Sequence, residues 1–270
     1  MKDAPSSTAL LVASGVAFQS THPRFGHLVS DEAGELARHF VAAAGRRVRS
    51  GSSRVDRLVV AAQERLTVPG ITLHYVLRKR TIEELVRAAI ADGYGRLVVL
   101  GAGLDTLALR LSRQVRAVEV DHPATQCLKR TLVTGAIEFI AADLTTETFA
   151  VHNDATLFVA EAVFLYLTEA QVRGVLAQIR NVEYARLIFT FWEPRKPVNF
   201  KNATPLADWW LRRNGEPGRW AIAPENLAEF LASEGFSLIE LARDDDYHRR
   251  YVSEHVPLAK GEHIAVACPQ

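Results

Sequence analysis

The chain has few of the residues that mark special classes of protein. Its two cysteines, Cys127 and Cys268, lie far apart and outside any C-x-x-C or Cys/His spacing, so neither a disulfide scaffold nor a zinc or redox site is indicated. The 32 basic and 31 acidic residues nearly cancel, which gives no general electrostatic reason to expect nucleic acid or a membrane surface as partner. No apolar run reaches the 18 residues typical of a membrane span. We therefore expect a cytoplasmic protein in a reducing compartment.

The composition is that of an ordinary globular protein. With 48% apolar and 23% charged residues, the chain fits neither the collagen-like nor the disordered class. A length of 270 residues allows one large domain or one domain with an added subdomain. Residues 8–18 have the length of a signal-peptide core and follow Lys2, but Asp3 and the lack of an A-x-A site favour a buried helix.

The first third of the chain has a helical pattern. Asp31 and Ser53 are placed to cap helices, the second of which is predicted over residues 54–66. Pro69 and Gly70 break the pattern, and apolar residues at three- and four-residue spacings predict a further helix over residues 75–91. Residues 1–92 are therefore expected to form an N-terminal helical cap.

From residue 93 the pattern changes to short apolar runs separated by helix-like stretches. A helix is predicted over residues 168–179, with Thr168 as its cap, and another over residues 224–233. This alternation predicts an α/β fold, a doubly wound, mostly parallel Rossmann-like sheet with an antiparallel closing strand, over residues 93–270. The predicted strands are residues 97–100, 115–120, 137–141, 156–160, 187–191, 236–241 and 263–268.

Residues 194–222 follow neither pattern. The segment holds four prolines and the adjacent Trp209 and Trp210, so it is an insertion in the strand–helix alternation. Insertions near the carboxyl ends of parallel strands often cover a ligand crevice, which makes a substrate lid one interpretation. A packed structural loop is the other, since large aromatic side chains fill cores as readily as they line pockets.

A glycine turn follows the first predicted strand. Gly101 and Gly103 would let the backbone turn sharply and approach a nucleotide-like ligand closely. Thr106 stands where a dinucleotide-binding turn has its third glycine, which counts against a pyrophosphate held by the following helix. Asp121, twenty positions after Gly101, ends the second predicted strand and is suited to accept hydrogen bonds from both ribose hydroxyls.

Acidic residues also follow the third and fourth predicted strands. Asp143 and Glu161, with Asp121, would line the carboxyl edge of the sheet with negative charge. Such an edge suits the sulfonium and ammonium groups of S-adenosylmethionine and repels the phosphates of NAD, although each acid alone could equally be a helix cap or a solvated charge. The carboxylate of S-adenosylmethionine needs a basic donor. Arg78 and Arg80 are the candidates, and a solvated basic face is the alternative.

Four motifs together resemble the leucine carboxyl methyltransferase family. They are LVVLGAGLDTLALRL from residue 97, VEVDHP from residue 118, AADL from residue 141 and EAVFLYL from residue 161. The resemblance covers residues 8–174 and is to the bacterial branch that includes O-methyltransferases of polyketide pathways, which implies a role in secondary metabolism. It also implies that Arg78 holds the cofactor carboxylate, Asp121 the ribose and Glu161 the amino group. The implied cofactor-binding residues are Arg78, Gly101, Gly103, Asp121, Asp143, Leu144 and Glu161.

Two positions depart from the family pattern. Val16 and Ala17 stand where many relatives carry a basic residue followed by Ala, which removes one contact to the cofactor carboxylate or the substrate. Leu107 replaces a frequent arginine after the glycine turn. These departures keep open a different class of function, a cofactor-binding protein that no longer transfers methyl groups or that catalyses another reaction.

The leading hypothesis is O-methyl transfer from S-adenosylmethionine to a small metabolite, with a carboxylate as one acceptor. Displacement at a sulfonium needs no metal, and a carboxylate is already ionised at neutral pH and needs no general base. Tyr166 is the one candidate to face the acceptor, a core position being its alternative, and no histidine spacing nominates a base. Methylation of a protein's C-terminal carboxylate is a second hypothesis, and an NAD-dependent oxidoreductase is a distant one.

Overall fold

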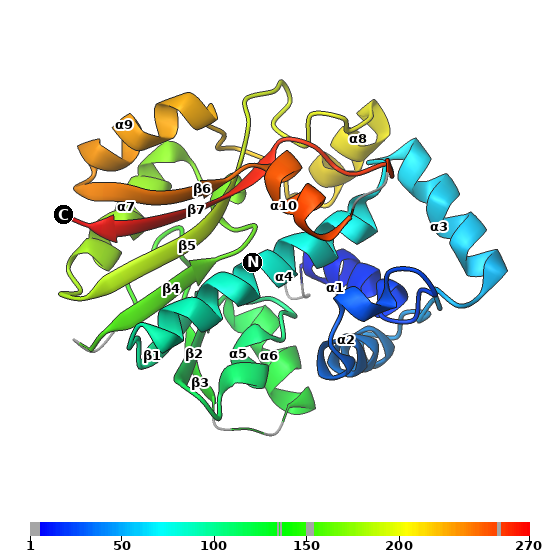
Figure 1. Cartoon of the computed structure of the whole chain (residues 1–270), viewed down its shortest axis with the longest axis horizontal. Helices are drawn as coiled ribbons and strands as arrows, with labels where there is room; N and C mark the ends of the chain where they lie inside the picture. The colour runs from blue at the N-terminus through cyan, green and yellow to red at the C-terminus, as the bar shows by residue number, and fades with distance from the viewer. Residues whose placement is uncertain (1–5, 134, 136, 150–153, 253–254) are drawn as a thin grey trace.

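A seven-stranded sheet forms the centre of the computed structural model, which describes residues 6–133, 135, 137–149, 154–252 and 255–270 (Figure 1). The strands are β1 (Arg96–Leu100), β2 (Arg116–Asp121), β3 (Ile137–Ala141), β4 (Thr156–Ala160), β5 (Ala185–Trp192), β6 (Phe236–Ala242) and β7 (Glu262–Pro269). They lie in the order β3-β2-β1-β4-β5-β7-β6. The pairs among β1 to β5 are parallel, and β7 runs antiparallel to both β5 and β6. The predicted fold class is therefore confirmed.

Helices cover both faces of this sheet. The α-helices are α1 (Ser7–Gln19), α2 (Asp31–Ala43), α3 (Arg54–Leu66), α4 (Ile71–Ala91), α5 (Leu107–Leu111), α6 (Pro123–Leu132), α7 (Glu169–Arg180), α8 (Pro205–Arg213), α9 (Leu227–Ser233) and α10 (Asp244–Tyr251). Short 3-10 turns form η1 (Gly26–Leu28), η2 (Phe164–Tyr166) and η3 (Pro224–Asn226). Helices α4, α5 and α10 pack on one face of the sheet, and α7 and α9 on the other (Figure 1).

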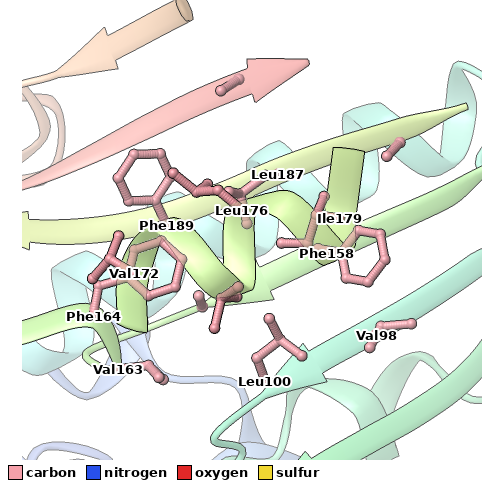
Figure 2. Packing of buried hydrophobic residues seen from close by; sticks show 14 of the residues in the cluster. Val98, Leu100, Phe158, Val163, Phe164, Val172, Leu176, Ile179, Leu187 and Phe189 are labelled. Atoms are coloured by element: carbon pink, nitrogen blue, oxygen red, sulfur yellow. The ribbon is translucent and has the colours of Figure 1, made fainter. Parts of the chain in front are cut away.

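The core on the α7 side shows why the sequence forms this layer. Val172, Leu176 and Ile179 recur on one face of α7 and point at the strands, where Phe158 and Leu187 meet them (Figure 2). All five side chains are at most 1% exposed. Burying each one stabilises the fold by about 1.5–3 kcal/mol. Because both sheet faces are covered in this way, the central strands read as continuous apolar runs.

Most predicted elements are present, with differences at helix starts. Thr168 caps α7, as predicted, and its hydroxyl belongs to a capping box. The cap prediction at Asp31 is wrong, because Ser30 is the N-cap of α2 and Asp31 is the first helical residue. Helix α4 begins at Ile71 rather than at residue 75, directly after the break at Gly70.

The insertion at residues 194–222 contains a helix that the sequence pattern did not indicate. Helix α8 begins at Pro205, and Thr204 caps it. The Thr204 N–H also donates to the carbonyl of Thr67 at 2.8 Å, and its hydroxyl donates to the carbonyl of Leu66 at 2.6 Å. The insertion is thus fastened to the end of α3.

Helix α1 connects the N-terminal region to α4. Helix α1 lies against α2 and α4, with Val16 and Ala17 buried at their junction. Residues 1–5, the start of the expected helical cap, lie outside the described residues. None of the helices within the described ranges is long and apolar enough to cross a membrane.

Candidate cofactor-binding site

The carboxyl ends of β1, β2 and β4 open onto a cavity of about 790 Å³, a size typical of small-molecule sites. The parallel strands bring together side chains that lie far apart in the sequence. All the predicted site residues line this cavity, namely Arg78, Gly101, Gly103, Asp121, Asp143, Leu144 and Glu161, together with the acceptor-facing candidate Tyr166.

The glycine turn is tight and close to its neighbours. Gly101 and Gly103 have φ angles of +58° and +52°, in the left-handed region that side chains rarely adopt. A Cβ atom on Gly101 would lie 2.6 Å from Val163 Cγ2, and one on Gly103 would lie 3.2 Å from Ala9 Cβ. The positive φ angles and these close neighbours both favour glycine at the two positions.

Asp121 lies across the glycine turn. Its carboxylate accepts hydrogen bonds from the N–H groups of Gly103 and His122, both at 2.6 Å. Burial raises the pKa of Asp121, and these two N–H groups oppose the rise. A carboxylate oxygen has two lone pairs, so Asp121 can still accept from two hydroxyl groups. His122 has a structural role as well, since its ring caps α6.

Asp143 and Leu144 follow β3 at the side of the cavity. The Thr145 hydroxyl and N–H donate to Asp143 Oδ1 at 2.6 and 2.8 Å, and these bonds lower the pKa of Asp143. This oxygen therefore stabilises the loop after β3, a role that neither of the two alternatives, a helix cap or a solvated charge, describes. Leu144 is half-buried against the core on the α7 side.

Arg78 lies at the back of the cavity and is only 2% exposed. Its Nε and Nη2 donate to Glu161 Oε1 at 3.0 and 2.7 Å, and its Nη1 donates to Glu262 Oε2 at 2.7 Å. Burial alone would lower the pKa of Arg78, but the two carboxylates raise it. The alternative of a solvated basic face is wrong for Arg78. It describes Arg80 better, which pairs with Glu84 at 3.4 Å while half-exposed.

Lys79 and Asp105 complete a charged cluster beside the glycine turn. Lys79 forms an ion pair with Asp105 and lies 3.1 Å from Glu161. Burial alone would lower the pKa of Lys79, and these carboxylates raise it. With Arg78 and Glu262, the cluster has two cations and three carboxylates, which leaves one excess negative charge in the cluster.

Sequence reasoning missed three members of this cluster, Lys79, Asp105 and Glu262. Asp105 lies in the motif of the glycine turn, but that motif alone assigns it no role. Lys79 stands between two arginines, in a run that reads as a basic surface. Glu262 precedes the apolar residues predicted as the last strand, and it extends that strand by one residue in the structure. An acid at the start of a buried strand was the available signal, because such a residue requires a partner.

Ala162 directly follows Glu161 and has an unusual backbone. Its φ angle of +54° is positive, as for no other non-glycine residue in the described part of the chain. The Ala162 N–H donates to Thr190 Oγ1 at 2.9 Å, so β5 holds this conformation. Strain of this kind costs about 1–3 kcal/mol and concentrates at functional sites.

The opposite wall of the cavity, its roof, is apolar and comes from α1. Glu216 from the insertion accepts hydrogen bonds from the first two N–H groups of α1 at 3.1 and 3.0 Å. The insertion lines the cavity with Gly215 and Glu216, and not with Trp209 or Trp210. The α1 residues on the roof are Ala9, Val12, Ala13 and Val16, at the spacing of one helix face.

Tyr166 lies between the roof and the strand ends. It is half-buried, and its phenol contacts the Thr8 hydroxyl on α1. Burial raises the pKa of Tyr166, so the phenol is neutral at physiological pH. Tyr166 can therefore orient a ligand by hydrogen bonding but does not supply a ready base.

Comparison with known sequences supports the motif resemblance. The family model for leucine carboxyl methyltransferase matches residues 9–180. YktD of Bacillus subtilis is 24% identical over 193 residues, which cover 63% of both chains. SCO7813 of Streptomyces coelicolor is 30% identical over 161 residues, 53% of this chain and 55% of that protein. Both are named as candidate S-adenosyl-L-methionine-dependent methyltransferases. The chain spans less than two thirds of the length of these relatives.

Solved structures resemble this fold. A DUF574 family protein from Streptomyces avermitilis superimposes with a TM-score of 0.59 at 15% identity, over 86% of this chain and 96% of that one. A candidate methyltransferase from Thermobifida fusca gives 0.57 at 16% identity, over 86% and 94%. At these identities the likeness concerns the fold. With the family match over residues 9–180, the conclusion is that the chain belongs to the leucine carboxyl methyltransferase family.

Proposed function

We propose that this protein transfers a methyl group from S-adenosylmethionine to an oxygen atom of a small metabolite. The carrying observation is that Asp121, Asp143 and Glu161 line one cavity beside the glycine turn. An anionic wall attracts a sulfonium and an ammonium group and repels the diphosphate of NAD. Family membership and the names of the relatives support the same cofactor.

The residues fit this cofactor group by group. Arg78 donates three of its five N–H groups within the chain, so two are left for a carboxylate. Glu161 can accept from an ammonium group, and Asp121 from ribose hydroxyls. Gly101 and Gly103 line the cavity with backbone atoms, which a ligand can approach closely. When bound, S-adenosylmethionine supplies a methyl group on positively charged sulfur, which a nucleophile displaces in line.

The roof supports a small acceptor. The apolar face of α1 lines the cavity, and a water-poor pocket would favour near-attack positioning of the two reactants. Every cation on the cavity wall within the described ranges is paired with an acid of this chain, as Arg87 and Arg110 are with Glu83 at 2.7 and 2.6 Å. These pairs favour neither acceptor, because Arg78 is paired in the same way and is still proposed to hold the cofactor carboxylate. A carboxylate acceptor needs no base, whereas a hydroxyl acceptor must give its proton to a base, for which the cavity wall offers several carboxylates. A protein C-terminus as acceptor is less well supported, because a cavity of about 790 Å³ is typical of small-molecule sites.

Calorimetric titration tests the cofactor part of the proposal. We expect S-adenosylmethionine and its demethylated product, S-adenosylhomocysteine, to bind with micromolar affinity, and NADH not to compete. Absence of binding by both thioethers at high micromolar concentration would remove the proposal. Incubation with methyl-labelled cofactor and matched series of hydroxyl and carboxyl compounds then tests transfer. If the cofactor binds but no label ever moves, the protein is a cofactor-binding protein without transfer.

A further inference from the structure

Behind Arg78, β7 contributes a carboxylate that the proposed function has not used. Glu262 is 0% exposed, and its Oε2 accepts hydrogen bonds from Arg78 Nη1 and His74 Nε2, both at 2.7 Å. Its other oxygen, Oε1, is buried and has no hydrogen-bond partner within the described ranges. Glu262 thus contacts the back of the guanidinium group whose front lines the cavity.

Two histidines continue the contact away from the cavity. His74 Nδ1 lies 3.1 Å from His248 Nε2, and both side chains are buried. His74 Nε2 carries its proton when it donates to Glu262, so Nδ1 is the acceptor and His248 is the donor. The result is a directed chain of hydrogen bonds that runs from α10 through α4 to the carboxylate on β7.

The charges in this chain are costly to bury. Burial alone would raise the pKa of Glu262, but Arg78 and His74 lower it to about 2, so Glu262 is ionised at neutral pH. A buried ion pair is commonly no more stable than packed apolar side chains of similar volume. Stability alone therefore does not account for Glu262, whereas a need to fix the orientation of Arg78 does.

We propose that Glu262 is a positioning residue for the methionine end of the cofactor, acting through Arg78. Glu161 holds one edge of the guanidinium and Glu262 holds Nη1, which leaves one N–H on each Nη atom. A carboxylate is bound best by two such N–H groups held in a fixed plane. His74 and His248 in turn fix Glu262. This inference rests on the proposed function, since it assumes that the cavity takes S-adenosylmethionine.

A second Glu–His pair, one residue further along β7, offers a control. Glu193 directly follows β5 and accepts a hydrogen bond from His263 Nε2 at 2.8 Å. His263 is the residue after Glu262 on β7. This pair is another Glu–His contact at the same end of the sheet. Neither Glu193 nor His263 lines the cavity or contacts Arg78 within the described ranges.

The test compares two ligands that differ only at the methionine end. The probes are S-adenosylhomocysteine and 5′-methylthioadenosine, which retains the thioether nucleoside but lacks the amino acid. We expect Glu262→Gln to raise the Kd of S-adenosylhomocysteine by about tenfold or more, while the Kd of 5′-methylthioadenosine changes less than about twofold. Glu193→Gln should change neither value by more than about twofold. Equal weakening of both ligands by Glu262→Gln, or no weakening of either, would overturn the inference.

Two substitutions at His74 keep the test decisive if Glu262→Gln does not fold. In His74→Gln the side-chain amide can still donate to Glu262, whereas His74→Asn is too short to do so and can accept only from His248. His74→Asn should therefore lower the affinity for S-adenosylhomocysteine more than His74→Gln does. Equal losses of affinity would contradict the inference. The proposed function fails separately, if the unaltered protein binds neither S-adenosylmethionine nor S-adenosylhomocysteine.

Discussion

The cavity has a floor at the strand ends, formed by Gly101, Asp121 and Glu161, and a roof formed by α1. The two are positioned by different kinds of contact. Gly101 and Glu161 directly follow β1 and β4, and Asp121 is the last residue of β2, so parallel strand pairing alone brings these floor residues to one edge. The roof depends on a contact between residues 209 positions apart, Ser7 and Glu216. The comparison teaches that the sheet topology positions the residues at the strand ends, whereas long-range packing positions the roof.

Removal of a floor carboxylate should have the largest effect. Asp121→Ala removes the acceptor of two ribose hydroxyls, and we expect the Kd of S-adenosylhomocysteine to rise about 100-fold. Calorimetry on the folded variant measures this. Asp92→Ala, which removes an exposed ion pair with Arg186 at 2.8 Å, serves as the control and should leave the Kd unchanged. An Asp121→Ala variant that binds like the control would refute the assignment of the floor.

The crowding around the glycine turn predicts the next largest effect, a loss of stability. Gly101→Ala introduces a left-handed alanine whose Cβ meets Val163 at 2.6 Å, so the free energy of unfolding should fall by roughly 2 kcal/mol or more. Gly45 has a similar φ of +67° with no atom within 4 Å of an added Cβ. Gly45→Ala should therefore cost only about 1 kcal/mol. Urea unfolding gives both values, and equal losses would show that the turn is not crowded.

The histidine chain behind the floor predicts a pH dependence. Burial, and then the neighbouring His74, lower the pKa of His248 from its usual 6.5 to about 3. As the pH falls below about 6.5, the unfolded chain binds a proton that the folded chain does not. The free energy of unfolding should then fall by up to about 1.4 kcal/mol per pH unit, down to about pH 3. His248→Gln should make this decline shallower in urea unfolding between pH 7 and pH 4, and parallel declines would contradict the prediction.

The roof contact predicts the smallest effect. Glu216→Gln weakens the interaction of a carboxylate with the N-terminus of α1, which is worth about 0.3–1 kcal/mol. We expect a loss of unfolding free energy in that range, with the Kd of S-adenosylhomocysteine changed less than about threefold. Glu138→Gln, at an exposed position on β3, is the control. A large loss of cofactor affinity in Glu216→Gln would show that roof and floor are not separable.

The floor residues could be predicted from the sequence, whereas the roof contacts could not. The residues at the ends of β1, β2 and β4 could be predicted because buried strands, the glycine turn after β1 and the acids at the ends of β2 and β4 are local signals. Glu262 is 184 positions from Arg78, and no local pattern links the two. The N-cap of α2 was predicted wrongly for another reason, because Ser30 and Asp31 are adjacent and both residue types can cap a helix. Helix α8 was missed because the prolines around it mask its start.

A crystal structure with S-adenosylhomocysteine bound tests the central claim most directly. The account predicts both ribose hydroxyls on the Asp121 carboxylate, the amino group at Glu161 and the carboxylate on the two remaining N–H groups of Arg78. A nucleoside bound elsewhere, or one whose amino-acid end lies away from Arg78 and Glu161, would contradict it.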